Sequence, residues 1–416
     1  MLFLFYFACV LALAVGKNEE YKGYRVYNIA LSSKLQQDHL SALQLDYLRK
    51  PSFQYDVDGL AILPPSDFKS FEENLTKLGI PIDVFSEDVY QYLLENSEDI
   101  AADERNADGQ NEAFDIRRYH RYDNILNYLR QLPEQYNTTN SSIELVQFGV
   151  THENRPLVYL KINNNSSAES VNTEKPIIVV EAAINPREWI TIPAVLNVVE
   201  GILEEERFLI GADWIVLPVV NPDGYEYTHT NLRLWQKSRS TNSNLGHICP
   251  GVNINRNFDV DWQNFDASSS PCSHVYAGIE PFSEVETRMI QSIIQENGSK
   301  IKLYISLQNN GGFISYPWSF ERAASGLFRQ HHLLGFDMIA STNETYRLDV
   351  ASTIFDRASG TSNDHARKSN IFYTFNIDIV QRGSSVLIPE SDISVIVDDV
   401  WKAVSVAANE VIGLFN

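Results

Sequence analysis

Side chains that could move a proton or bind a ligand lie close to the apolar runs of the chain. Glu188 adjoins Arg187, Asp378 lies near the end of another run, and Arg256 follows Asn255. A carboxylate can accept a proton, and a guanidinium beside an amide suits the carboxylate at the end of a peptide. The alternative for the Asn255–Arg256 pair is that it only satisfies buried polar groups.

Four apolar runs predict the elements that position these residues. The runs cover residues 176–184, 213–220, 301–307 and 371–380. Continuous apolar runs are typical of buried central strands, and helical stretches at 190–206 and 397–415 alternate with them. The pattern predicts an α/β fold, in which functional sites gather at the carboxyl ends of the strands.

A smaller α+β unit is predicted before this region. Its predicted strands cover 23–31, 59–63 and 81–85, its predicted helices cover 32–48 and 67–79, and a short segment at 89–96 closes it. Ser66 is the expected N-cap of the second helix. Residues 95–113 are acidic and lack apolar periodicity, which predicts a linker. Arg105 is an isolated basic residue there, either a cleavage site for a trypsin-like protease or an ordinary exposed residue of the linker.

Composition excludes several classes of protein. The 416 residues are 44% hydrophobic and 21% charged, unlike a disordered chain, a collagen or a coiled coil. The formal net charge of −21 repels phosphate groups, so nucleic acid and anionic membranes are not expected partners. Nothing in the sequence specifies an oligomeric state.

The N-terminus predicts secretion. An apolar run from Met1 to Leu13, followed by small residues, indicates a signal peptide over residues 1–16. In an oxidising compartment Cys249 and Cys272 are expected to form a disulfide, and two free thiols are the alternative. Sequons suited to an extracellular glycoprotein occur at Asn74, Asn137, Asn140, Asn164, Asn165, Asn297 and Asn343.

The chain resembles the zinc carboxypeptidase family, in particular the zymogen form of the carboxypeptidase A/B branch. Seven motifs carry the resemblance: REWI (187–190), VVNPDGYEYT (219–228), RLWQKSRS (233–240), GVNINRNFD (251–259), SSSPCS (268–273), FSEVET (282–287) and ASGTSND (358–364). The resemblance implies a large mixed-sheet α/β domain over 116–416. A small pro-domain over 17–105 and a linker over 106–115 would precede it, with activation cleavage at Arg105.

The resemblance also implies a zinc site, and most of its positions are changed here. The family holds zinc by His, Glu and His, and these positions carry Asn185, Glu188 and Gln308. The oxyanion-stabilising Arg is replaced by Gln236, and the general-base Glu by Asp378.

More of the family's residues are retained at the positions that the resemblance implies to bind substrate. Arg187, Asn255 and Arg256 are retained, whereas Phe355 takes the place of the capping Tyr. Asn363 lies at a position that lines the family's side-chain pocket.

These replacements have physical consequences. Amide oxygens are poor zinc ligands compared with imidazole, so zinc is expected for the family but is not expected to bind tightly here. Asp378 is one methylene shorter than Glu, about 1.5 Å, and Gln236 has no charge to stabilise an oxyanion. Hydrolysis by the family's mechanism is therefore not expected.

Three functional hypotheses follow. The first is a secreted, inactive carboxypeptidase A/B homologue whose cleft binds peptide C-termini. The second is a metallocarboxypeptidase with an altered metal site and weak release of C-terminal residues. The third is a partner-binding protein with a vestigial cleft.

Overall fold

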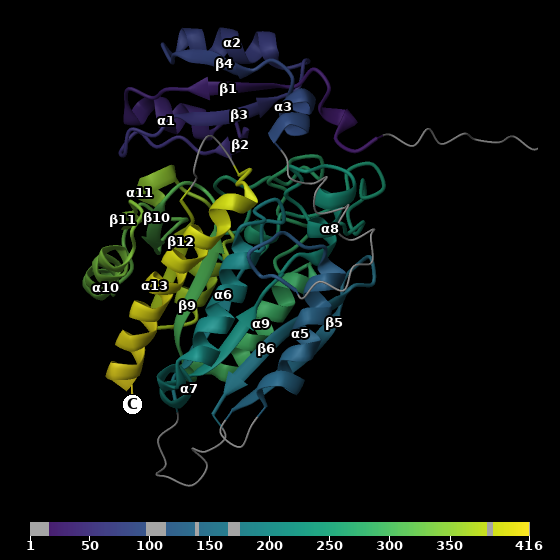
Figure 1. Ribbon diagram of the computed structural model, residues 1–416. Helices are drawn as coiled ribbons and strands as arrows, with labels where there is room; N and C mark the ends of the chain where they lie inside the picture. Colours follow the sequence, from purple (N-terminus) through teal and green to yellow (C-terminus); the bar gives the residue numbers. More distant parts are fainter. Residues whose placement is uncertain (1–15, 97–113, 138–140, 165–174, 381–385, 416) are drawn as a thin grey trace, which may run out of the picture.

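The computed structural model describes residues 16–96, 114–137, 141–164, 175–380 and 386–415. They form an eight-stranded sheet between helices and a separate four-stranded unit above one end of that sheet (Figure 1). The expected signal peptide and the expected cleavage site at Arg105 lie outside the described residues, apart from Gly16. No described helix is long and apolar enough to cross a membrane.

The large sheet has the strand order β11-β10-β12-β9-β7-β8-β6-β5. Its strands are β5 (Ser142–Val150), β6 (Pro156–Asn163), β7 (Ile177–Glu181), β8 (Asp213–Leu217), β9 (Ile301–Gln308), β10 (Phe313–Tyr316), β11 (Arg347–Val350) and β12 (Tyr373–Asp378). The four central strands β12, β9, β7 and β8 are parallel, and they are the four apolar runs of the sequence. Their carboxyl ends therefore meet at one edge of the sheet.

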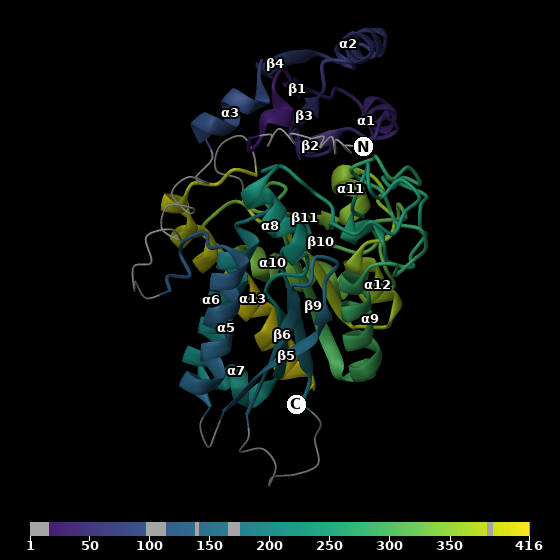
Figure 2. The same cartoon turned by 90° about the vertical axis from the view of Figure 1, so that its right-hand side faces the viewer.

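Helices cover both faces of this sheet (Figure 2). On one side lie α5 (Tyr122–Tyr136), α6 (Thr191–Glu204), α7 (Glu206–Gly211) and α13 (Glu390–Phe415), and on the other α9 (Val285–Asn297) and α12 (Ser362–Lys368). Two apolar clusters, one on each face, form the core. The other described helices of this domain are α8 (Pro222–Thr230), α10 (Phe328–Ser341) and α11 (Ala351–Phe355), with single turns η3 (Ile254–Arg256) and η4 (Gly298–Lys300).

The N-terminal unit, residues 16–96, contains a four-stranded antiparallel sheet that lies above the large domain (Figure 1). Its strands, in the order β2-β3-β1-β4, are β1 (Arg25–Ile29), β2 (Asp46–Arg49), β3 (Gly59–Leu63) and β4 (Ile82–Ser86). Its helices are α1 (Lys34–Ser41), α2 (Phe68–Lys77) and α3 (Val89–Asn96), with the turn η1 (Glu19–Tyr21). Strand β2 faces the large domain (Figure 1).

Two predictions in this unit are wrong. The helix predicted over 32–48 ends at Ser41, and residues 46–49 form β2. Pairing of β2 with β3 outweighs the helical spacing of the leucines, and Gln44 adopts a positive φ of 47° between the two elements. The N-cap of α2 is Asp67 rather than Ser66, whose hydroxyl donates to the Asp67 carboxylate instead.

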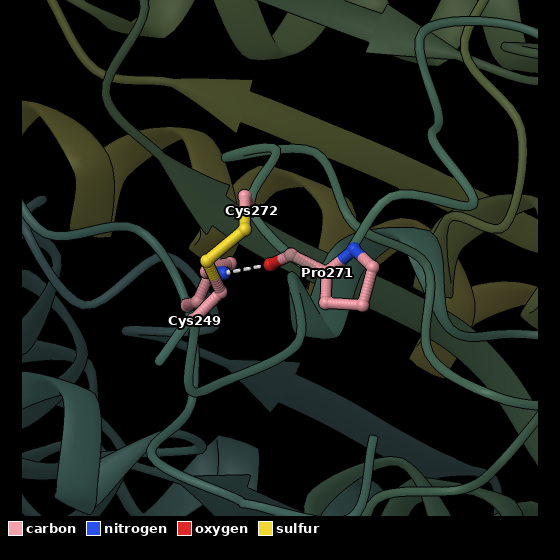
Figure 3. The surroundings of a disulfide bond; sticks show 4 residues. Cys249, Pro271 and Cys272 are labelled. Atoms are coloured by element: carbon pink, nitrogen blue, oxygen red, sulfur yellow. Dashed lines mark hydrogen bonds between the residues drawn. A yellow bond between two sulfur atoms is a disulfide. The ribbon is translucent and has the colours of Figure 1, made fainter. Parts of the chain in front are cut away.

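The predicted disulfide is confirmed. Cys249 and Cys272 are bonded, with Cα atoms 4.9 Å apart (Figure 3). Beside them, Lys237 Nζ donates to the carbonyl oxygen of Pro271 at 2.7 Å. The cross-linked loop thereby contacts the segment that carries Gln236.

Candidate functional site

The fold brings four of the predicted residues to the carboxyl ends of three adjacent strands. Asn185 and Glu188 follow β7, Gln308 ends β9, and Asp378 ends β12. Gln308 and Asp378 lie opposite each other in the β9–β12 register. The parallel sheet therefore gathers residues that are almost 200 positions apart in the sequence.

Glu188 is buried and receives two hydrogen bonds. Asn185 Nδ2 donates to its Oε1 at 2.7 Å, and the backbone N–H of Asn309 donates to its Oε2 at 2.9 Å. Burial raises the pKa of Glu188 to about 7, although the Arg187 charge and these two bonds oppose the rise. The carboxylate is thus held by neutral donors.

Asp378 is also buried, with 5% of its surface exposed. Burial raises the pKa of Asp378 to about 8, and the nearby Glu188 carboxylate adds to the rise. Gln308, which lies beside it, donates from Nε2 to the hydroxyl of Ser306 at 3.2 Å. This edge of the sheet therefore contains two carboxyl groups that resist ionisation below pH 7.

Arg187 and Gln236 lie together and contact the same residue of the N-terminal unit. Asp46 Oδ1 accepts from Arg187 Nη1 at 2.9 Å and from Gln236 Nε2 at 2.6 Å. Arg187 Nη2 also donates to the backbone carbonyl of Tyr47. The start of β2 thus accepts from both terminal nitrogens of Arg187 and from the amide of Gln236, whereas Arg187 Nε has no hydrogen-bond partner among the described residues.

Arg256 binds a carboxylate of its own domain. Its Nη2 donates to Asp266 Oδ2 at 2.5 Å, and its Nε donates to the Asp266 backbone oxygen at 2.6 Å. The third nitrogen, Nη1, donates to the carbonyl of Asn255 at 2.8 Å. The side chain of Asn255 faces α12, where Oδ1 accepts from the Ser362 N–H at 2.9 Å.

Lys50 enters this region from the N-terminal unit. Its Nζ lies 2.6 Å from Asp266 Oδ2, and its backbone N–H donates to Asn310 Oδ1 at 3.1 Å. The Lys50 charge also lowers the pKa of Glu188 and of Asp378 against the stronger effect of burial. The charge of Lys50 therefore acts on Asp266 and on both carboxyl groups at the edge of the sheet.

Asn363 lies on α12, and Phe355 is the last residue of α11. Asn363 is 1% exposed, and its amide nitrogen and oxygen both lack a hydrogen-bond partner among the described residues. Phe355 packs edge-on against Phe313, with ring centroids 5.1 Å apart, and lines a cavity between the two units. The pocket position is thus a neutral amide, and the capping position is an aromatic ring without a hydroxyl.

Comparison with known proteins agrees with this geometry. The family described as zinc carboxypeptidase matches residues 125–403. Carboxypeptidase B of Helicoverpa zea is 31% identical over 98% of this chain and 99% of its own length. The chain belongs to the zinc carboxypeptidase family.

Solved structures of zinc carboxypeptidases share the fold. The crystal structure of carboxypeptidase A from Helicoverpa armigera has a TM-score of 0.84 and 26% identity, covering 95% of this chain and 98% of that one. Carboxypeptidase B of Astacus astacus is 33% identical over 70% of this chain and 96% of its own length. The mixed α/β fold predicted from the sequence is therefore confirmed.

The residues present do not fit the zinc ion of the zinc carboxypeptidase family. Asn185 presents its amide nitrogen, a donor, to Glu188, and Gln308 presents its nitrogen to Ser306. Zinc needs three imidazole, carboxylate or thiolate ligands, and amide groups are weak substitutes. No group of three or more His, Cys, Asp or Glu that could hold a metal ion occurs within the described ranges.

Sequence reasoning missed three residues of this zinc carboxypeptidase homologue. Asp46 and Lys50 belong to the N-terminal unit, and Asp266 lies in an irregular loop between η3 and α9. Each of the three contacts a charged residue that is between 10 and 216 positions away in the sequence. No local motif could have identified them, although Asp266 follows the Asn255–Arg256 motif on the same loop.

Proposed function

We propose that this protein is a secreted, catalytically inactive member of the zinc carboxypeptidase family that binds peptide C-termini without cleaving them. The proposal rests on the contrast between the carboxylate-binding position, which is retained, and the metal-ligand positions, which are mostly changed. Arg256 pairs with a carboxylate at 2.5 Å, whereas two of the three metal-ligand positions hold amides.

Loss of hydrolysis follows from the chemistry of the changed positions. Without tightly bound zinc, no metal lowers the pKa of a water molecule or polarises the peptide carbonyl. Gln236 can donate a hydrogen bond but carries no charge, and its Nε2 already donates to Asp46. Asp378, with a pKa raised to about 8, is largely protonated at neutral pH and is then no proton acceptor.

Binding of a C-terminus uses the guanidinium of Arg256. Arg256 is 8% exposed, so a carboxylate that reaches it is largely removed from water and forms charge-assisted hydrogen bonds. The unsatisfied amide of Asn363 would favour a polar side chain at the last position of the peptide, since its donor and acceptor both need partners.

The test combines metal content, cleavage and binding for the full chain and for an active carboxypeptidase. We expect zinc far below one ion per chain by elemental mass spectrometry and no release of C-terminal residues. Isothermal titration with acetyl-Gly-Gly-Xaa peptides (Xaa is Gln, Phe or Lys) should show weak binding that Arg256→Ala abolishes. Binding unchanged by Arg256→Ala would refute the proposal.

The enzymatic alternative makes the opposite prediction for the metal. A metallocarboxypeptidase with an altered site would contain about one zinc ion per chain, lost in Glu188→Ala. The third hypothesis, a partner-binding protein with a vestigial cleft, is favoured by the contacts of Asp46 with Arg187 and Gln236, since they cover donors in the cleft. Partner binding that is unaffected by Arg256→Ala would support it.

A further inference from the structure

Asp266 occupies the edge of Arg256 that a peptide carboxylate would need. The side chain of Asp266 accepts from Nη2 and its backbone carbonyl accepts from Nε, while Asn255 takes the remaining nitrogen. A guanidinium binds a carboxylate through two adjacent N–H groups, and here both edges already have acceptors. An incoming C-terminus must therefore displace Asp266.

A second cation holds Asp266 in this position. Lys50 Nζ contacts the same oxygen, Oδ2, that accepts from Arg256, at 2.6 Å and 2.5 Å respectively. The side chains of Lys50, Asp266 and Arg256 are 29%, 16% and 10% exposed, so water screens the three charges only in part. Since Lys50 belongs to the N-terminal unit, the contact joins that unit to the cleft.

We propose that Asp266 is an internal ligand of Arg256, and that Lys50 of the docked N-terminal unit holds it there against competing peptide C-termini. The inference rests on the proposed function, because it assigns the regulation of the same guanidinium. Departure or displacement of the N-terminal unit removes one of the two cations on Asp266. The internal carboxylate then competes less well with a peptide.

The structure provides an alternative position for a displaced Asp266. Asp266, Lys50 and Phe355 line the cavity between the two units together with Arg357. Arg357 stacks on the ring of Phe265 at 3.4 Å, and its Nε has no hydrogen-bond partner among the described residues. An Asp266 side chain that leaves Arg256 can thus turn into this cavity, toward the guanidinium of Arg357.

The backbone of Asp266 determines which variant tests the idea. Its φ is 44°, a left-handed conformation that Asn and Asp tolerate better than other non-glycine residues. Asp266→Asn therefore keeps the backbone and the shape of the side chain while it removes the charge. Asp261 on the same loop has a φ of 49° and contacts Asn264 and Ser359 rather than Arg256, so Asp261→Asn is the matched control.

The experiment is isothermal titration of the full chain with acetyl-Gly-Gly-Xaa peptides, each as the free acid and as the C-terminal amide. Asp266→Asn should tighten binding of the free acids by about tenfold, the size of one lost charge-assisted contact, and leave the amides unchanged. Lys50→Gln should tighten it by a smaller factor of about three. Asp261→Asn, and Lys22→Gln at an exposed pair with Glu19, should match the natural protein.

Separate outcomes test the inference and the proposed function. If Arg256→Ala abolishes binding but Asp266→Asn binds no tighter than the natural protein, the internal ligand is refuted and the proposed function stands. If Arg256→Ala leaves binding intact in the Asp266→Asn background, the proposed function is refuted. A folded Asp266→Asn protein that binds no free acid refutes both. If Asp266→Asn does not fold, an unchanged affinity in Lys50→Gln refutes the inference.

Discussion

Two regions of the site differ in whether their buried carboxyl groups stay ionised. The first is the edge of the sheet with Glu188 and Asp378, and the second is the ion cluster of Arg256, Asp266 and Lys50. In the first region, Asn185 and the Asn309 backbone donate to Glu188, and burial raises the pKa of Glu188 and of Asp378 although the charges of Arg187 and Lys50 oppose the rise for Glu188 and that of Lys50 opposes it for Asp378. In the second region, Asp266 lies between Arg256 and Lys50, and their charges hold its pKa well below the usual range although burial alone would raise it. A buried carboxyl group stays ionised only where a cation pairs with it directly.

The two regions correspond to different parts of the family's site, and only the second keeps paired charges. Where zinc would supply positive charge in the family, this chain has amides and carboxyl groups that can become neutral. Where the family binds a terminal carboxylate, this chain has a complete ion cluster. We therefore expect the largest effect from restoring metal ligands in the first region, a smaller one from breaking the ion cluster of the second, and smaller effects still from single changes of charge.

Restoring the missing imidazoles should have the largest effect. We expect Asn185→His with Gln308→His to bind about one zinc ion, since Glu188 then completes three ligands. Zinc at about a thousandfold above its Kd would raise the free energy of unfolding by about 4 kcal/mol. Elemental mass spectrometry and chemical denaturation with and without zinc measure both quantities.

The single variant Asn185→His is the control for this restoration. With only two good ligands it should retain little zinc after desalting. A double variant that also lacks zinc would show that the geometry at the strand ends, and not only the residue types, has diverged from the family.

Breaking the ion cluster should have the next largest effect. Arg256→Ala leaves Asp266 with one cation in place of two, and we expect a loss of about 3 kcal/mol of unfolding free energy, as for a largely buried pair. Arg322→Ala is the matched control, because Arg322 pairs with Asp38 and Asp356 but is 43% exposed. Its loss should stay below about 1 kcal/mol. Equal losses in urea unfolding would contradict the contrast between the clusters.

Much of this architecture could be predicted from the sequence because its signals are local. The four central strands are continuous apolar runs, and the residues that follow them had to meet at one edge of a parallel sheet. The position of Glu188 beside Asn185, and of Asp378 beside Gln308, follows from that topology. The single helix that leucine spacing predicts over residues 32–48 is wrong, because residues 46–49 form β2, which is stabilised by pairing with β3.

The contacts that decide how the cleft is occupied could not be predicted in this way. From the sequence, Arg256 could either bind a ligand or only satisfy buried polar groups, and the structure shows it bound to Asp266. Whether a side chain on an irregular loop turns toward a guanidinium depends on backbone dihedrals that no periodicity encodes. Lys50 reaches Asp266 only because the two units dock.

The pH dependence of stability should distinguish the two regions with a moderate effect. Because the folded-state pKa of Asp378 is raised to about 8 from 3.8, its contribution favours folding most at low pH and is lost as pH rises toward 8. The stability of Asp378→Asn relative to the natural protein should therefore increase steadily from pH 4 to pH 8, with no difference between the two near pH 4.

Urea unfolding at several pH values measures this difference, and Asp398→Asn serves as its control. Asp398 is 57% exposed, so its substitution should leave the pH profile unchanged. A gap between Asp378→Asn and the natural protein that is constant with pH would contradict a buried, titrating carboxyl group.

The smallest expected effect comes from returning charge to the changed oxyanion position. Gln236 Nε2 already donates to Asp46 Oδ1 at 2.6 Å, and Asp46 is 27% exposed. Gln236→Arg should then stabilise docking of the N-terminal unit by only about 0.5 kcal/mol, the value of a partly screened ion pair. It should restore no release of C-terminal residues, because the amides at positions 185 and 308 still leave the zinc site incomplete. Measurable cleavage by this variant would show that hydrolysis was limited by the missing guanidinium, and the assignment of inactivity to the metal positions would then be wrong.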